Sequence, residues 1–271
     1  MDFDPDTIRQ FEHAGWERAA GAYADTFAHA SGTYIQALLD AAAIGTGIRV
    51  LDLACGPGIV TWAAARRGAV ATGYDFSAAM LREAQRQHPD MTFEQGDAEA
   101  LPYADGTFDA VVSNFGMHHF PHPDRAAAQA WRVLRPGGHF AFSSWADPVR
   151  NIAWRLLFDA IRAEGDPVAA KTPPSGGGLA QIDAVSAVLR GAGFDDVVAG
   201  YETREWVVAG AADLVASLRR GTVRTAALIE AQDSAAMPAI LAHIERAAAS
   251  YRRGGRLAVP IVAILAHGTK G

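Results

Sequence analysis

The stretch Val50-Leu51-Asp52-Leu53-Ala54-Cys55-Gly56-Pro57-Gly58 decides the fold. Its apolar start, from Arg49 to Leu53, predicts a buried strand, and a helix is expected to follow the glycines and run to Arg67. Gly56 and Gly58 have no Cβ atom, so the backbone can approach a ligand closely. The helix start adds unpaired amides and a positive dipole end, which suits a carboxylate. The stretch therefore predicts a strand–loop–helix unit that binds a small ligand.

Short apolar runs alternate with helical segments after this unit, which predicts an α/β fold with a parallel sheet covered by helices on both faces. Further strands are expected at residues 70–75, 91–95, 108–114, 139–145, 196–208 and 257–266. Helices are expected at about residues 7–41, 77–88, 124–134, 152–164, 182–192, 211–232 and 234–253. A loop is expected at 171–179, which holds two prolines and three consecutive glycines. These elements divide the chain into a helical lid (1–48), a sheet domain (49–204 and 257–271) and a helical cap inserted between its last two strands (205–256).

Carboxylates follow the next two strands of the predicted sheet. Asp75 ends the second strand, where it is positioned to accept from both hydroxyls of a ribose, and Asp97 ends the third, where an adenine amino group would use it. The carboxyl ends of parallel strands are where ligands bind in open α/β sheets. A dinucleotide fingerprint needs a third glycine, and the two possible registers place Thr61 or Ile59 there instead. The pattern therefore favours an adenosyl ligand over a dinucleotide.

Four linked stretches resemble the class I S-adenosylmethionine (SAM) dependent methyltransferases, in the small-molecule group that contains ubiquinone and menaquinone biosynthesis enzymes. They are VLDLACGPG (50–58), GYDFSAAML (73–81), FEQGDAEALPYADGTFDAVVSNFGMHH (93–119) and VLRPGGHFAFSSW (133–145). The resemblance implies a Rossmann-like, seven-stranded, mostly parallel sheet with an antiparallel last strand, and SAM as the cofactor.

The same resemblance implies a role for each matched position. Asp52 and the backbone from Ala54 through Gly56 to Gly58 would hold the methionine part of SAM, and Asp75 the ribose. Phe76 and Ala98 would sandwich the adenine, Asp97 would take its amino group, and Asn114 would lie beneath the methionine part. Met80 and Phe115 complete the cofactor set. Ala54 departs from the family pattern, because many relatives carry glycine there.

Two aromatic residues of the N-terminal helix are further candidates for the cofactor site. Trp16 and Tyr23 are seven residues apart, which places them on one helical face. An aromatic face tolerates a sulfonium cation, so these rings would close over the cofactor. Packing in the core is the alternative role.

Histidines follow the fourth strand, at the edge of the sheet that faces the acceptor. His119 or His118 could accept a phenol or amine proton near neutral pH. A structural or positioning role is the alternative for both. A metal site built from them and His122 is not expected, because adjacent side chains diverge and no carboxylate or cysteine supports them.

Composition narrows the choice of acceptor. The net charge of −6 lowers the prospect of a nucleic-acid substrate, and the stretch after Asn114 lacks the Pro-Pro-aromatic pattern of nucleobase amino methylation. The single cysteine, Cys55, cannot form a disulfide within the chain, which fits the cytoplasm. No apolar run is long enough to cross a membrane, and the acidic N-terminus is unlike a signal peptide. Oligomeric state stays open, a homodimer included.

A small organic acceptor, methylated on oxygen, nitrogen or carbon, is the function that the sequence predicts. The alternatives are a nicotinamide-dependent oxidoreductase and a non-catalytic SAM-binding protein. Basic residues outnumber acidic ones from Glu205 onward. They indicate either an anionic acceptor or a solvated helix face.

Overall fold

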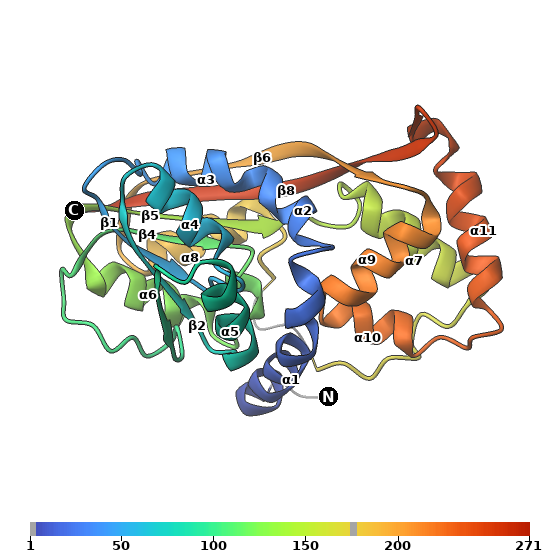
Figure 1. The fold of residues 1–271 in the computed structure, drawn as a ribbon, viewed down its shortest axis with the longest axis horizontal. Helices are drawn as coiled ribbons and strands as arrows, with labels where there is room; N and C mark the ends of the chain where they lie inside the picture. The colour runs from blue at the N-terminus through green and yellow to red at the C-terminus, as the bar shows by residue number, and fades with distance from the viewer. Residues whose placement is uncertain (1–3, 174–177) are drawn as a thin grey trace.

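A computed structural model describes residues 4–173 and 178–271. One eight-stranded sheet runs through them in the order β3-β2-β1-β4-β5-β8-β6, with the short β7 paired to β8 (Figure 1). Its strands are β1 (Arg49–Leu53), β2 (Val70–Asp75), β3 (Thr92–Gln95), β4 (Phe108–Asn114), β5 (Leu134–Trp145), β6 (Phe194–Val208), β7 (Arg252–Arg253) and β8 (Arg256–Lys270).

The pairing confirms a mostly parallel sheet with a reversed last strand. β1 pairs in parallel with β2 and β4, while β8 lies antiparallel between β5 and β6. Two residues, Arg252 and Arg253, add a strand beyond the seven expected. β8 also extends past the predicted Ala266, because the Lys270 ammonium donates to the Leu134 carbonyl at 2.8 Å.

Helices cover both faces of the sheet, because successive apolar side chains of a buried strand point to opposite faces and both sets must be covered. Val50 and Val112 face a cluster built with α3 (Ile35–Ala41) and α4 (Ile59–Arg66). Leu51 and Val111 face the opposite cluster, built with α6 (Pro123–Val133) and α8 (Ile182–Gly191). α5 (Ala78–Gln87) packs beside β2 and β3. The remaining short helices are α2 (Ala28–Ser31), η1 (Gly32–Tyr34), η2 (Met117–His119) and η3 (Ala249–Tyr251).

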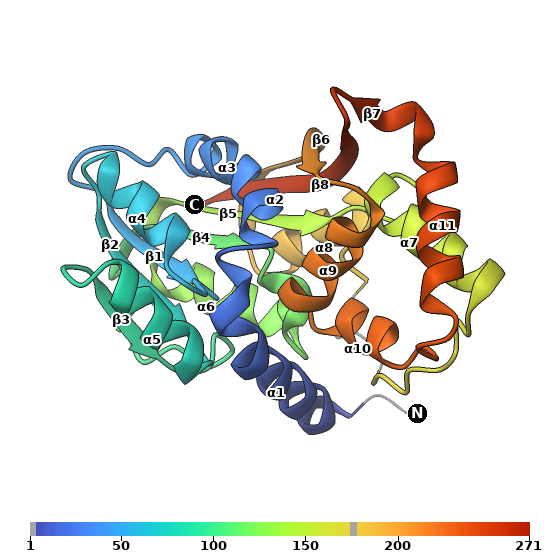
Figure 2. The same cartoon turned by 45° about the vertical axis from the view of Figure 1, so that its right-hand side comes forward.

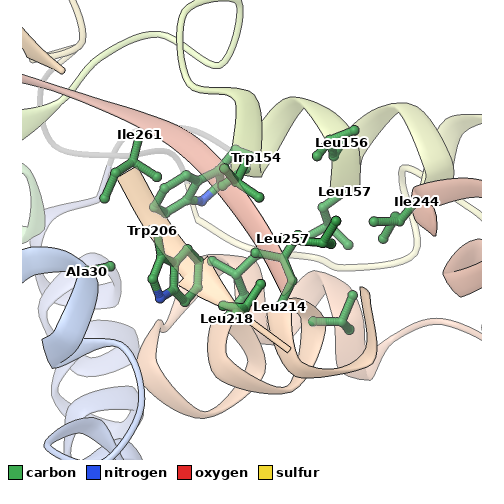
Figure 3. Close-up of a cluster of buried hydrophobic side chains, with 14 of the residues drawn as sticks. Ala30, Trp154, Leu156, Leu157, Trp206, Leu214, Leu218, Ile244, Leu257 and Ile261 are labelled. Carbon is green, nitrogen blue, oxygen red and sulfur yellow. The ribbon is translucent and has the colours of Figure 1, made fainter. Parts of the chain in front are cut away.

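A group of helices gathers at one end of the long β6–β8 pair, on the right of Figure 1. They are α7 (Ile152–Glu164), α9 (Ala211–Gly221), α10 (Arg224–Glu230) and α11 (Met237–Ala247). Figure 3 shows the cluster that joins them, in which Trp154 and Leu157 meet Leu214, Leu218 and Ile244. The cap insertion expected at 205–256 therefore packs together with α7, which the sequence had placed in the sheet domain.

The N-terminal helix α1 (Pro5–Tyr23) lies between the sheet domain and the cap. It packs against α5 on one side and α9 on the other (Figure 2). The helical region expected at 7–41 is interrupted at residues 24–27 before α2 begins. This turn allows α1 to run away from the sheet domain and toward the cap.

The helices of the cap are shorter than the sequence predicts. The expected helix at 211–232 divides into α9 and α10, because Thr222 adopts an extended conformation. The expected helix at 234–253 is formed only over α11. Part of the loop expected at 171–179, residues 174–177, lies outside the described residues. In the described ranges, no helix combines the length and the apolar character needed to cross a bilayer.

Candidate cofactor and acceptor site

The turn after β1 carries three residues with left-handed backbone. Ala54, Gly56 and Gly58 have φ of 54°, 53° and 79°. The conformation costs an alanine roughly 1–2 kcal/mol, which explains why glycine would suit position 54 better. Strain of this kind persists where the surrounding structure fixes it, typically at functional sites. The turn brings the backbone at Ala54 and Gly56 to the wall of a cavity with about 740 Å³ of empty space, part of which is open to solvent.

Gly58 does not line this cavity. A Cβ atom at Gly58 would lie 2.6 Å from the Phe93 ring and 3.3 Å from the Ala84 side chain. Its missing side chain therefore makes room for β3 and α5 rather than for a ligand. A contact between the Gly58 backbone and the cofactor stays a prediction.

Asp75 ends β2 and binds the glycine turn directly. One of its carboxylate oxygens accepts the Gly56 N–H at 2.9 Å, and the other accepts the Ser77 N–H at 2.9 Å. Burial raises the pKa of Asp75 to about 6, and these backbone hydrogen bonds oppose the rise. Asp75 lines the cavity, and a carboxylate oxygen can accept more than one hydrogen bond. The carboxylate can therefore still accept two hydroxyl groups.

Asp52 lies deep in the same cavity and is only half satisfied. Its Oδ2 accepts the Thr61 hydroxyl at 2.6 Å, while Oδ1 has no hydrogen-bond partner among the described residues. Burial raises the pKa of this carboxyl to about 7, and the nearby Asp75 adds to the rise. An unpaired buried carboxylate oxygen is costly, so this position suits a cationic or N–H donor on a ligand.

A second cavity of about 380 Å³ adjoins the first and shares Asp75 and Phe76 with it. Asp97 and Ala98 line this second cavity and not the first. The Arg9 guanidinium of α1 lies 3.3 Å from the Asp97 carboxylate. Phe76 therefore lies between two adjoining cavities at the ends of β2 and β3. An extended ligand would need both cavities.

Asn114 and Phe115 form the floor of the larger cavity. The Asn114 amide donates to the Ser31 carbonyl at 3.2 Å and its oxygen accepts the Ser143 hydroxyl at 2.7 Å. Phe115 has a φ of 60°, which is unusual for a bulky residue. Its ring stacks on Trp145 at 3.8 Å between centroids. The floor is thus rigid and aromatic.

Helix α1 supplies one wall. The Trp16 and Tyr23 rings both line the cavity and meet edge to face, with centroids 5.7 Å apart. The Tyr23 hydroxyl lies 2.9 Å from the Ser31 hydroxyl. The Glu17 carboxylate of α1 accepts from the Ser77 hydroxyl at 2.7 Å, next to Met80 of the cavity wall. The shared face of Trp16 and Tyr23 points inward, as their spacing predicted.

The two candidate histidines lie in different environments. His119 lines both cavities, and Trp16 meets its ring edge to face at 4.9 Å. His118 is partly buried and lines neither of them, and desolvation holds its pKa well below the usual range. His119 is therefore the better placed of the two to meet an acceptor, and the role of either histidine as a base stays a prediction. Within the described residues no group of ligands could hold a metal ion.

Sequence reasoning missed Glu12, which lies 2.9 Å from the Nδ1 atom of His119. It also missed Ser31 and Phe120 of the cavity wall. A signal for Glu12 existed: it precedes Trp16 by one helical turn, which places a carboxylate on the inward face of α1.

A segment of the sheet domain matches a known family. Residues 51–142 match a family model described as a methyltransferase domain. The YcgJ protein of Bacillus subtilis has the same fold, with a TM-score of 0.58 and 18% identity over 88% of this chain and 98% of that chain.

Two relatives that are named as methyltransferases match part of the chain. A demethylmenaquinone methyltransferase of Renibacterium salmoninarum is 40% identical over 130 residues, which are 46% of this chain and 55% of that protein. A malonyl-[acyl-carrier protein] O-methyltransferase of Pectobacterium atrosepticum is 38% identical over 130 residues, 48% of this chain and 51% of that protein. The chain spans about half the length of the curated relatives it matches.

Proposed function

We propose that the protein is a SAM-dependent methyltransferase that acts on a small organic molecule. One observation carries the proposal: Asp52, Asp75 and the strained turn between them converge on a single cavity inside a methyltransferase domain. The two relatives are named for a quinone precursor and an acyl-carrier substrate, so the acceptor is proposed only as a class.

The residues of the two cavities fit the parts of SAM. The free Oδ1 atom of Asp52 suits the aminium group, and the Gly56 backbone suits the methionine carboxylate. Asp75 would accept the ribose hydroxyls, while Phe76 and Ala98 would enclose the adenine in the smaller cavity. Asp97 would then bind the adenine amino group beside Arg9. When bound, SAM supplies a methyl group on a positively charged sulfur, and Trp16 and Tyr23 would face that charge.

SAM affinity is expected to rise with pH, because Asp52 and Asp75 have pKa values of about 7 and 6. Below these values the empty site holds protons that must leave before the carboxylates can bind the cofactor. Affinity should therefore fall by about tenfold between pH 7 and pH 6, and by up to about 100-fold for each further pH unit below pH 6. Calorimetry at several pH values, in buffers of different ionisation enthalpy, should show proton release on binding.

Asp52→Asn is the control for this proton release. The variant should bind SAM more weakly, with a pH dependence that begins only below the pKa of Asp75. An affinity that stays constant from about pH 5 to pH 8 would contradict the proposed ionisation.

The acceptor side of the cavity is aromatic and uncharged except for one base. Trp16, Tyr23, Phe115 and Phe120 form its walls, and His119 stands among them. In the described chain, Arg219 and Arg220 line a separate groove between α1 and the cap. This arrangement supports a planar, neutral acceptor with a hydroxyl or amine at the reacting position. It disfavours the anionic acceptor that the excess of basic residues in the cap had indicated.

The two helical regions are proposed to enclose the reaction. Residues 1–48 would act as a lid over SAM, because α1 contributes Trp16 and Tyr23 to the cavity. The cap would close the acceptor side together with α7. The net charge of −6 supports a small molecule over nucleic acid, and the buried thiol of Cys55 supports a cytoplasmic setting.

Binding and turnover together test the proposal. Calorimetry should detect SAM and S-adenosylhomocysteine but not NADH, and NADH binding in their place would support an oxidoreductase. A panel of phenols, quinols, amines and carboxylates, assayed by S-adenosylhomocysteine release, should identify an acceptor. His119→Gln should lower kcat on a hydroxyl or amine acceptor by about 100-fold. SAM binding without turnover on any acceptor would support a non-catalytic protein.

A further inference from the structure

Glu12 is a carboxylate with no exposed surface, on the inward face of α1. Burial alone would raise its pKa, but the charges and hydrogen bonds of His119 and Arg224 outweigh burial and lower the pKa. An unpaired buried charge costs several kcal/mol, so these two partners are what keep Glu12 ionised.

The three side chains come from distant segments of the chain. Glu12 belongs to α1, His119 ends η2 after β4, and Arg224 begins α10 of the cap. One carboxylate oxygen of Glu12 lies 2.9 Å from Nδ1 of His119, and the other lies 2.7 Å from Nε of Arg224. Arg224 is itself held by a hydrogen bond to the Pro173 carbonyl. Glu12 therefore stands between a ring that can change its charge and a guanidinium that cannot.

The contact with Glu12 selects the tautomer of His119. An ionised carboxylate accepts a hydrogen bond, so Nδ1 carries the proton and Nε2 is left as the nitrogen available to an acceptor. The Arg224 guanidinium lies on the other oxygen of Glu12, 2.7 Å away, and supplies the counter-charge of this buried carboxylate.

We propose that Glu12 and Arg224 are positioning residues that fix the ring of His119 with its proton on Nδ1 and with Nε2 free to act as the base. The proposal rests on the proposed methyl transfer and adds the acceptor class: a hydroxyl or N–H group that must lose a proton. As the acceptor atom bonds to the methyl carbon, its proton passes to Nε2. The carbon–sulfur bond breaks and its electron pair stays on sulfur. Glu12 then stabilises the imidazolium.

Two variants should move the protonation of His119 in opposite directions. Glu12→Gln keeps a hydrogen-bond acceptor but removes the negative charge beside Arg224, so His119 should protonate at lower pH, by about one pH unit or more. Arg224→Met leaves Glu12 without its counter-charge, so His119 should protonate at higher pH. NMR titration of the His119 ring in the protein without ligands measures both shifts. The groups that face the ring are Glu12, Arg224, His118 and Asp75.

The chain offers a matched control on its surface. His243 lies 3.1 Å from Glu164, which lies 3.8 Å from Arg246, all partly exposed. Glu164→Gln should shift the titration of His243 far less than Glu12→Gln shifts that of His119, because water screens exposed pairs. The same variant should leave the pH profile of turnover unchanged.

Turnover provides the second readout. The acidic limb of kcat against pH should follow the NMR shifts: to lower pH in Glu12→Gln and to higher pH in Arg224→Met. Shifts in the same direction, or no shift of the His119 ring in either variant, would overturn the proposal. If Glu12→Gln does not fold, the Arg224→Met titration decides alone. Because the NMR test needs no substrate, an absence of methyl transfer would refute the proposed function and leave the positioning test to be read separately.

Discussion

Asp75→Asn is expected to weaken SAM binding by about 100-fold or more. Both carboxylate oxygens of Asp75 already accept backbone N–H groups, from Gly56 and Ser77. An asparagine must turn its amide NH₂ toward one of these donors, which leaves that buried N–H unpaired and removes one acceptor for the ribose. Calorimetric titration with SAM and with S-adenosylhomocysteine measures the loss.

Asp97→Asn is the matched control. The Asp97 side chain is 43% exposed and pairs with Arg9, so its replacement should weaken binding much less. Asp75→Ala is a poorer test than Asp75→Asn, because it removes both backbone contacts and loosens the turn itself. Wild-type affinity in Asp75→Asn would show that Asp75 does not hold the ribose.

Gly58→Ala should destabilise the protein by about 3 kcal/mol. Its φ of 79° strains any residue with a side chain, and the new Cβ would lie 2.6 Å from the Phe93 ring. The clash pushes β3 away from the start of α4. Urea denaturation gives the free energy of unfolding.

Gly47→Ala separates strain from packing. Gly47 has a φ of 78°, but a Cβ there would meet no atom within 4 Å. This variant should lose only about 1 kcal/mol, the cost of the left-handed conformation. Equal losses in the two variants would show that Phe93 moves aside freely, and the packing argument would then be wrong.

The sheet could be predicted from the sequence because each strand is indicated by its own short stretch of residues. Phe108 and the apolar run from Ala110 to Val112 indicate a buried strand, and β4 has the predicted bounds. The break between α9 and α10 could not be predicted in this way. It comes at the extended Thr222, next to Gly221, where a Cβ would lie 2.1 Å from the Phe27 side chain, nearly two hundred residues earlier in the chain.

The cofactor side of the site was predictable for a similar reason. Asp75 and Asp97 each follow a strand directly, and parallel strands bring such residues to one edge. The pairing of Glu12 with His119 and Arg224 was not predictable, because three separate elements must pack before they meet. Gly58 shows that a motif position can also serve packing, because a Cβ there would lie 2.6 Å from the Phe93 ring.

The register of the last two strands has an evolutionary consequence. Val208 and Leu257 face each other across β6 and β8, although 48 residues of cap separate them along the chain. Both ends of the inserted segment therefore start from adjacent points on one rigid hairpin. A different helical segment could be grafted between them without disturbing the strands that carry the carboxylates. Exchange of this segment would be a direct route to new acceptors, provided that the graft again covers Trp154 and Trp206, which the present helices bury.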